Sequence, residues 1–218
     1  MNNKTYYHLI IDKSGSMASC VNETISGYNE QIQMIRDLQK LNPDQEIMVS
    51  LTAFNHFVSH ITTCSKPEDA ALLTTETYVP DGSTALLDAI GESVMSLKSR
   101  ANDEFNNDQA TAVVVIITDG YENASRFFSV NNVRNLIREL EATGKWTFSF
   151  LGADMAALEQ AQNLNIQKAN AASYRKADSG RVFEAMATSM DAYIFEKKAG
   201  RMKKSFLDKS DADSEDLF

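Results

Sequence analysis

The most constraining feature of this sequence is an unbroken apolar run, AVVVII, at residues 112–117. Because the run has no polar alternation, a strand made from it presents apolar side chains on both of its faces. Strands of this kind lie in the middle of parallel sheets that helices cover on both sides. The run ends in Thr118-Asp119-Gly120, a turn signal, which predicts that the strand stops there.

The rest of the chain alternates between short apolar segments and helical patterns. Val21, Ile25, Tyr28 and Ile32 recur at steps of three and four, which marks one face of an amphipathic helix. We expect strands at residues 6–11, 47–54, 57–63, 112–117 and 146–151, with a short edge strand starting at Ile166. We expect helices at residues 21–38, 86–97, 130–140, 155–164 and about 180–198.

This order of elements predicts an α/β fold, with a mostly parallel sheet and helices on both of its faces. Only Asn55-His56 separates the predicted strands at 47–54 and 57–63. So short a connection forces an antiparallel hairpin, because a parallel connection needs a long crossover. The sheet should therefore carry one antiparallel edge strand.

Composition sets the domain organisation. The chain has 218 residues, 43% of them hydrophobic and 23% charged, which suits one domain with a full core. We predict that residues 1–200 form this domain. Residues 201–218 are first basic and then acidic, with five acids and one lysine from residue 208 onward. Such a segment buries too little apolar surface to fold, so we predict a disordered C-terminal tail.

Charge and cysteine content narrow the classes of function. The formal net charge of -9 argues against direct binding to nucleic acid or to an anionic membrane, since both need a basic surface. Two cysteines, Cys20 and Cys64, are too few for a disulfide framework and favour a reducing compartment. No apolar run reaches transmembrane length. We therefore expect a soluble, cytoplasmic protein.

Three short motifs stand where chemistry is expected. DKSGS at residues 12–16 follows the first strand, DGST at 81–84 precedes a helix, and TDG at 118–120 follows the central strand. In open α/β sheets, ligands bind outside the carboxyl ends of the strands. If the first and the central strand are neighbours, Asp12 and Asp119 converge at this edge.

The convergent set would hold two carboxylates and three hydroxyls: Asp12, Ser14, Ser16, Thr84 and Asp119. All five offer hard oxygen ligands, and the set contains no histidine or cysteine. That chemistry selects Mg²⁺, Mn²⁺ or Ca²⁺ over zinc or copper. Because Mg²⁺ takes six oxygens and keeps some waters, one coordination position remains for an outside ligand.

These motifs resemble those of the von Willebrand factor A domain family. DKSGSM matches the family's D-x-S-x-S motif, DGSTALLDAI matches its threonine loop, and IITDGYEN matches its second aspartate. All five positions of a metal-ion-dependent adhesion site match, and the resemblance spans about residues 4–198. The stretches TDGYENASRFFS and WTFSFLGAD look more particularly like stand-alone bacterial and bacteriophage members of the family.

The resemblance implies a Rossmann-like, doubly wound fold and a divalent ion, usually Mg²⁺. It implies that Ser14, Ser16 and Thr84 coordinate through hydroxyls, and that Asp12 and Asp119 act largely through water. A partner protein's Asp or Glu carboxylate would complete the shell, since the ion is the dominant local charge. We therefore expect a metal-dependent protein-binding module and not an enzyme. Its rim should include these residues: Met17, Asp81, Ser83, Tyr121 and Glu122.

Two other classes of function stay open. One is a structural or assembly protein in which the site only stabilises the fold. The other is a Mg²⁺-dependent hydrolase, for which Glu122 is the one additional candidate base. A serine hydrolase is disfavoured because Ser14 and Ser16 lack the G-x-S-x-G context, and no Walker A motif is present. His56 and His60 are too few for a zinc site.

The acidic tail ends in Leu217-Phe218. A solvated tail is the simpler interpretation. The alternative is that the tail binds: it could recruit a partner, or a carboxylate such as Asp213 or Asp216 could dock on the metal of its own or a neighbouring chain. The last possibility would allow self-association.

Overall fold

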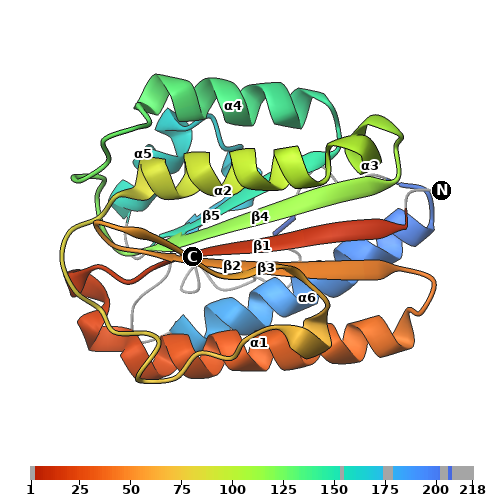
Figure 1. Ribbon diagram of the computed structural model, residues 1–218, viewed down its shortest axis with the longest axis horizontal. Helices are drawn as coiled ribbons and strands as arrows, with labels where there is room; N and C mark the ends of the chain where they lie inside the picture. The colour runs from red at the N-terminus through yellow and green to blue at the C-terminus, as the bar shows by residue number, and fades with distance from the viewer. Residues whose placement is uncertain (1–2, 153–154, 174–178, 202–205, 208–218) are drawn as a thin grey trace.

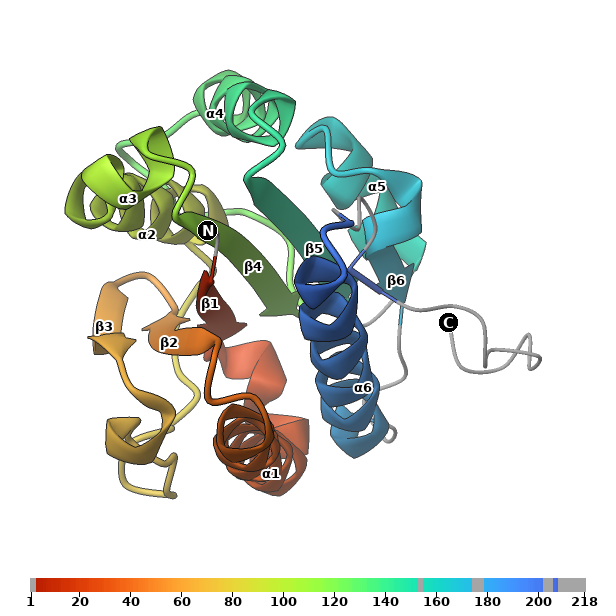
Figure 2. The same ribbon diagram turned by 90° about the vertical axis from the view of Figure 1, so that its right-hand side faces the viewer.

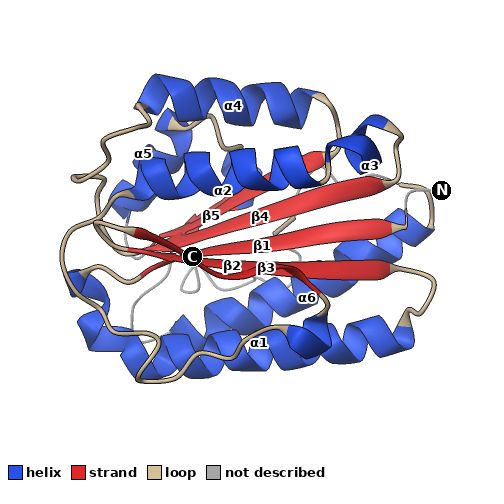
Figure 3. Ribbon diagram, viewed as in Figure 1, coloured by secondary structure: helices blue, strands red, loops and turns tan. Residues whose placement is uncertain are grey.

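The computed structural model describes residues 3–152, 155–173, 179–201 and 206–207. Within them, one sheet has the strand order β3-β2-β1-β4-β5-β6, and β3 is its one antiparallel strand (Figures 1 and 3). The strands are β1 Lys4–Asp12, β2 Glu46–Phe54, β3 Val58–Ser65, β4 Ala110–Thr118, β5 Trp146–Gly152 and β6 Ala171–Ser173. The expected α/β class and the antiparallel edge strand are confirmed.

Helices cover both faces of the sheet (Figure 2). One face carries α2, α3, α4 and α5, and the other carries α1 and α6. Their bounds are α1 Val21–Leu41, α2 Leu86–Arg100, α3 Asn102–Asn106, α4 Val130–Ala142, α5 Met155–Asn163 and α6 Ser179–Lys198. Short 3-10 turns lie at η1 Gly15–Cys20, η2 Pro67–Asp69 and η3 Lys168–Asn170.

The apolar run is the buried centre of the sheet, as its pattern predicts. Every residue of β4 is buried. Its side chains alternate between two cores: Val113 and Val115 face α1 and α6, whereas Val114 and Ile116 face the helices of the other side.

The expected short edge strand is present, but it does not start at Ile166. Ile166 instead closes α5: Asn165 adopts a left-handed φ of 66°, and the Ile166 amide donates to the Ala161 carbonyl at 3.0 Å. This arrangement is a common helix end, in which an apolar residue beyond the helix packs back on it. The edge strand is β6, which pairs with β5 from Ala171 onward.

The division of the chain at residue 200 stays a prediction, but two residues assigned to the tail belong to the core. Phe206 and Leu207 are buried on the α1 and α6 face. The Phe206 ring lies 6.1 Å from the Tyr7 ring and 6.3 Å from the Tyr193 ring, between centroids. Residues 208–218 lie outside the described part. No helix in the described part is long and apolar enough to cross a bilayer.

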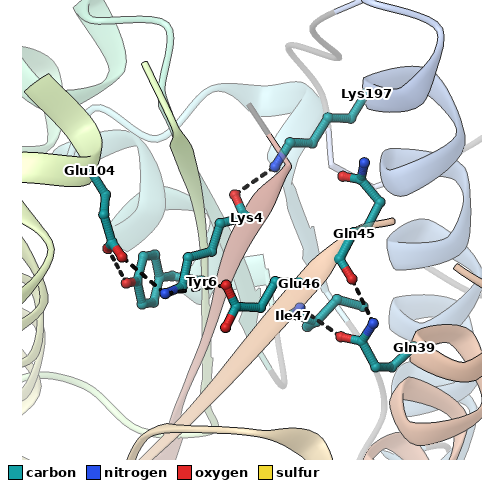
Figure 4. A network of polar contacts seen from close by, with 8 residues as sticks. All are labelled: Lys4, Tyr6, Gln39, Gln45, Glu46, Ile47, Glu104 and Lys197. Atoms are coloured by element: carbon teal, nitrogen blue, oxygen red, sulfur yellow. Dashed lines mark hydrogen bonds and ion pairs between the residues drawn. The ribbon is translucent and has the colours of Figure 1, made fainter. Parts of the chain in front are cut away.

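Charged side chains pair with each other at the end of the sheet where its parallel strands begin, here called the amino edge (Figure 4). The Lys4 ammonium lies 2.9 Å from a Glu104 carboxylate oxygen and 3.4 Å from a Glu46 oxygen. The Tyr6 hydroxyl donates to the other Glu104 oxygen. These contacts tie β1 to β2 and to α3.

A lysine from α6 reaches the same edge. The Lys197 ammonium donates to the Lys4 carbonyl at 2.6 Å, the Thr5 hydroxyl at 2.8 Å and the Thr111 hydroxyl at 3.0 Å. Burial lowers the pKa of Lys197 to about 7, because the charged form loses its hydration. The contacts fasten α6 across β1 and β4. Figure 4 shows the one with the Lys4 carbonyl.

Candidate functional site

The candidate site lies at the carboxyl edge of the sheet, where β1 and β4 end side by side. The two strands are parallel neighbours, with Ile11 paired to Ile117. Asp12 and the segment from Thr118 to Asp119 therefore leave the sheet at the same level. The neighbouring arrangement on which the sequence argument depended is present.

Asp12 is completely buried, and hydrogen bonds orient its carboxylate. One oxygen accepts from the Ser14 amide at 2.6 Å, and the other accepts from the Thr118 hydroxyl at 2.5 Å. Burial raises the pKa of Asp12, the bonds from Thr118 and Ser14 oppose that rise, and the nearby charge of Asp119 adds to it. A buried carboxylate charge is costly unless an opposite charge pairs with it, so the position suits a nearby cation.

Two serine hydroxyls connect the end of β1 to the end of β4. The Ser14 and Ser16 hydroxyl oxygens are 3.1 Å apart, and the Ser16 hydroxyl donates to Asp119 at 2.6 Å. A chain of hydrogen bonds thus connects four of the five predicted residues: Asp12, Ser14, Ser16 and Asp119. Ser14 is buried, whereas Ser16 is exposed.

Thr84 is positioned by backbone contacts from both sides. The Gly15 amide donates to the Gly82 carbonyl at 3.0 Å, which draws the 81–84 loop onto the DKSGS turn. On the other side, the Thr84 amide donates to the Asn123 side-chain oxygen at 2.8 Å, and the Thr84 carbonyl accepts from the amides of Asn123 and Ala124. The threonine loop is therefore fixed between the other two motifs.

The three loops surround one point beside Gly120. A Cβ atom built on this glycine would lie 3.0 Å from the Thr84 hydroxyl, 3.5 Å from an Asp12 carboxylate oxygen and 3.6 Å from the Ser14 hydroxyl. Oxygens from the first two motifs thus converge around a space beside Gly120 of the third motif, which a side chain at position 120 would fill.

The donor set fits a hard divalent ion. Carboxylate and hydroxyl oxygens are the ligands that Mg²⁺, Mn²⁺ and Ca²⁺ prefer. The described residues contain no group of three or more His, Cys, Asp or Glu side chains placed to hold a metal. That finding is compatible with this set, because only two of its five members, Asp12 and Asp119, are of those types.

Two of the expected rim residues have other roles. Met17 is buried in the core. Glu122 accepts hydrogen bonds on both carboxylate oxygens: Ala124 and Ser125 amides donate to one, and the Leu87 amide and the Ser125 hydroxyl donate to the other. Glu122 therefore caps the start of α2. The remaining three, Asp81, Ser83 and Tyr121, are exposed.

Sequence reasoning missed Asp88, which organises the loop after β4. Its carboxylate accepts from the amides of Arg126, Phe127 and Phe128 at 2.8–3.0 Å. The available signal was an acid on the buried face of a predicted helix, since a buried carboxylate needs partners. Asp88 and Glu122 together fasten the 121–128 loop to α2.

No protein-family model matches this sequence, and no curated protein does either. Solved structures do match. The von Willebrand domain of the type V pilus tip protein Mfa5 from Porphyromonas gingivalis superposes with a TM-score of 0.62 at 11% identity, over 89% of this chain and 97% of that one. The fold is that of a von Willebrand factor A domain.

Two other solved structures are similar to this chain in fold. The PilB minor pilin from Streptococcus sanguinis matches with a TM-score of 0.57 and 13% identity, over 88% of this chain. This chain spans 62% of that pilin, less than two thirds of its length. The manganese-loaded TRAP protein of Plasmodium vivax matches with a TM-score of 0.53 and 14% identity, over 83% of this chain and 72% of that one.

Proposed function

We propose that this chain is a metal-dependent protein-binding module that captures a partner's carboxylate through a bound divalent cation, Mg²⁺ or else Mn²⁺ or Ca²⁺. The observation that carries the proposal is the convergence of Thr84, Asp12 and Ser14 oxygens beside Gly120. These atoms come from two loops that are far apart in the sequence, and Gly120 lies in a third. The partner would be a protein that presents an Asp or Glu side chain.

The five predicted residues would hold the ion in two different ways. Ser14, Ser16 and Thr84 would offer neutral hydroxyl ligands, and Asp12 and Asp119 would act largely through water. The ion would supply positive charge that attracts a carboxylate. Asp12 already accepts bonds from Ser14 and Thr118, so its carboxylate is held in place and partly satisfied before any ion binds.

The structural neighbours support the adhesion part of the proposal. The Mfa5 and PilB proteins are pilus components, and the TRAP structure is loaded with manganese. Those properties belong to those proteins. For this chain they favour binding of a protein and of a divalent metal.

A binding role also suits the residues better than catalysis does. A hydrolase needs a base beside the ion, and both oxygens of Glu122 accept hydrogen bonds from the loop and from α2. We place the activity in the cytoplasm of a bacterial cell or a phage-infected host. The free thiols of Cys20 and Cys64 support a reducing compartment.

Carboxylate capture is tested with Mn²⁺-loaded Asp216→Asn protein, which lacks one tail acid that could itself reach the ion, and whose water-proton relaxation reports waters bound to the ion. N-acetylglutamate amide is titrated in, with N-acetylglutamine amide as the uncharged control. We expect a saturable fall in relaxation with the carboxylate alone, because it displaces a bound water. An equal response to both compounds would contradict the proposal. Thr84→Val should weaken Mn²⁺ binding, whereas Thr63→Val, on the exposed side of β3, should not.

A further inference from the structure

Two exposed aromatic side chains stand beside the candidate metal site. Tyr121 directly follows Gly120 and is 59% exposed. Phe57, in the turn between β2 and β3, is 68% exposed. Its ring lies 4.3 Å from the His56 ring, between centroids, and His56 lies directly against Gly82 in the threonine loop. The two aromatics therefore come from loops that also build the site.

The turn that carries Phe57 is fixed to the threonine loop. The Asn55 side chain accepts from the Phe57 amide and donates to the Asp81 carbonyl, each at 2.9 Å. The Ala85 amide donates to the Asn55 carbonyl at 2.7 Å. Because the turn is held in this way, Phe57 is presented to solvent at a set place relative to Thr84. Rigid, exposed aromatics are common at the centres of protein interfaces.

A ligand that fits this surface would combine an acid with large apolar side chains. The acid would meet the ion, and the apolar groups would meet Tyr121 and Phe57. The chain itself carries such a segment at its end, where Asp216 is followed by Leu217 and Phe218.

The described part of the chain shows that this segment can reach the site. Phe206 is anchored by its contact with Tyr7 and by its amide, which donates to the Asn170 side chain at 2.7 Å. Tyr7 precedes Asp12 by five residues of β1, a distance of about 16 Å along the strand. The eleven residues 208–218 can span at most about 36–40 Å. The reach exceeds the distance along the strand about twofold.

We propose that the C-terminal segment, Asp216-Leu217-Phe218, docks on the metal site of its own chain. The Asp216 carboxylate binds the ion, and Leu217 and Phe218 pack against Tyr121 and Phe57. The segment then competes with an external carboxylate, so a partner must displace it. This inference rests on the proposed function, because without a bound cation the acidic segment would meet the negative charges of Asp12 and Asp119.

The direct test is nuclear magnetic resonance of the full chain loaded with Mn²⁺, which broadens signals from nuclei close to the ion. We expect the Leu217 and Phe218 signals to broaden, and Mg²⁺ to shift them without broadening. Broadening should persist on about tenfold dilution, because an intramolecular contact does not depend on concentration. Sharp signals in the loaded protein would overturn the inference. Broadening that vanishes on dilution would also overturn it and would assign the segment to a second copy.

A pair of tail variants gives a second readout. Asp216→Asn should weaken Mg²⁺ binding about fivefold, since the docked carboxylate and the ion stabilise each other. Asp208→Asn makes the same change beside the Phe206 anchor and should leave the affinity unchanged. Equal affinities in the two variants would contradict the inference. If the wild-type chain bound neither Mg²⁺ nor Mn²⁺, the proposed function would fail, whereas ion binding with a sharp tail would overturn this inference alone.

Discussion

At the amino edge of the sheet, charged groups are balanced by opposite charge or by several oxygens, whereas at the carboxyl edge carboxylates face neutral donors. Lys4 pairs with Glu46 and Glu104, and Lys197 donates to three oxygens. Asp12, by contrast, accepts from an amide and a hydroxyl, and Ser16 donates to Asp119. At the amino edge, the charged groups are thus balanced by groups of the chain itself. The carboxyl edge concentrates negative charge around a small space, which a cation would complement.

Burial acts on both edges but in opposite directions. It lowers the pKa of Lys197 to about 7 and raises that of Asp12, because each charged form loses hydration. At the amino edge, burying the charged Lys197 ammonium lowers the stability of the fold. At the carboxyl edge a bound divalent ion would reverse the effect, since positive charge beside Asp12 favours its ionised form.

The largest expected effect is on the free energy of unfolding, which should fall more when a carboxylate near the carboxyl edge is removed than when one at the amino edge is removed. Asp88→Ala leaves the amides of Arg126, Phe127 and Phe128 without their acceptor and should lower the free energy of unfolding by about 3 kcal/mol. Glu104→Ala removes the ion pair with Lys4 and the hydrogen bond from the Tyr6 hydroxyl at the amino edge, and should cost about 1.5 kcal/mol, because these groups are partly exposed. Urea denaturation measures both. Equal losses of stability would show that the two edges are held equally strongly, which contradicts this expectation.

A smaller effect concerns pH and the amino edge. The unfolded chain keeps the Lys197 proton up to about its usual pKa of 10.5, whereas the folded chain releases it near 7. The unfolded state therefore binds more protons between these values, and stability should rise with pH, by about 2 kcal/mol from pH 7 to roughly pH 9. Lys197→Met should lack this rise. Parallel stability curves for the two proteins would show that the buried ammonium keeps its ordinary pKa.

The next prediction probes the space at the carboxyl edge. Gly120→Ala places a methyl group 3.0 Å from the Thr84 hydroxyl and should weaken Mg²⁺ binding about tenfold, or 1.4 kcal/mol, while the fold remains. Gly15→Ala is the matched control, because its Cβ meets the Gly82 backbone at 3.4 Å, an ordinary contact. Calorimetric titration compares the two variants. Unchanged affinity in Gly120→Ala would place the ion elsewhere.

The smallest expected effect concerns the support under Asp12. The Tyr78 hydroxyl donates to the Asp12 carbonyl at 2.6 Å, so Tyr78→Phe should cost about 1 kcal/mol of stability. Tyr28→Phe removes a similar bond to the Ala71 carbonyl, away from the site. Both variants should lose similar stability in thermal denaturation, and both should bind Mg²⁺ as the wild type does. A selective loss of Mg²⁺ binding in Tyr78→Phe would show that this bond sets the site's geometry.

Much of the fold was predictable because it depends on local patterns. The run at 112–117 has no polar residue, which left a central buried strand as its natural place. The two-residue connection at Asn55-His56 likewise fixed the antiparallel pair. The convergence of Asp12 and Asp119 was predicted only on the condition that the first and the central strand are neighbours, and the structure meets that condition.

The remaining features depend on contacts between distant segments. Phe206 and Leu207 stand among polar residues, so their burial against Tyr7 and Tyr193 has no local signal. Ile166 is as apolar as a strand residue, yet it closes a helix. The proximity of Glu122 to the carboxyl edge suggested a rim position or a base, and its four hydrogen bonds became evident once α2 and the loop were placed together.

Binding of a divalent ion by the five predicted residues at the carboxyl edge is the step on which the proposed function depends. It is tested most directly by calorimetric titration of Mg²⁺ into chelator-treated protein, with acetate present to supply the outside carboxylate, beside Asp12→Ala. We expect saturable binding of one ion by the wild type and none by the folded variant. Absence of binding to the folded wild type, or equal binding to both proteins, would contradict it.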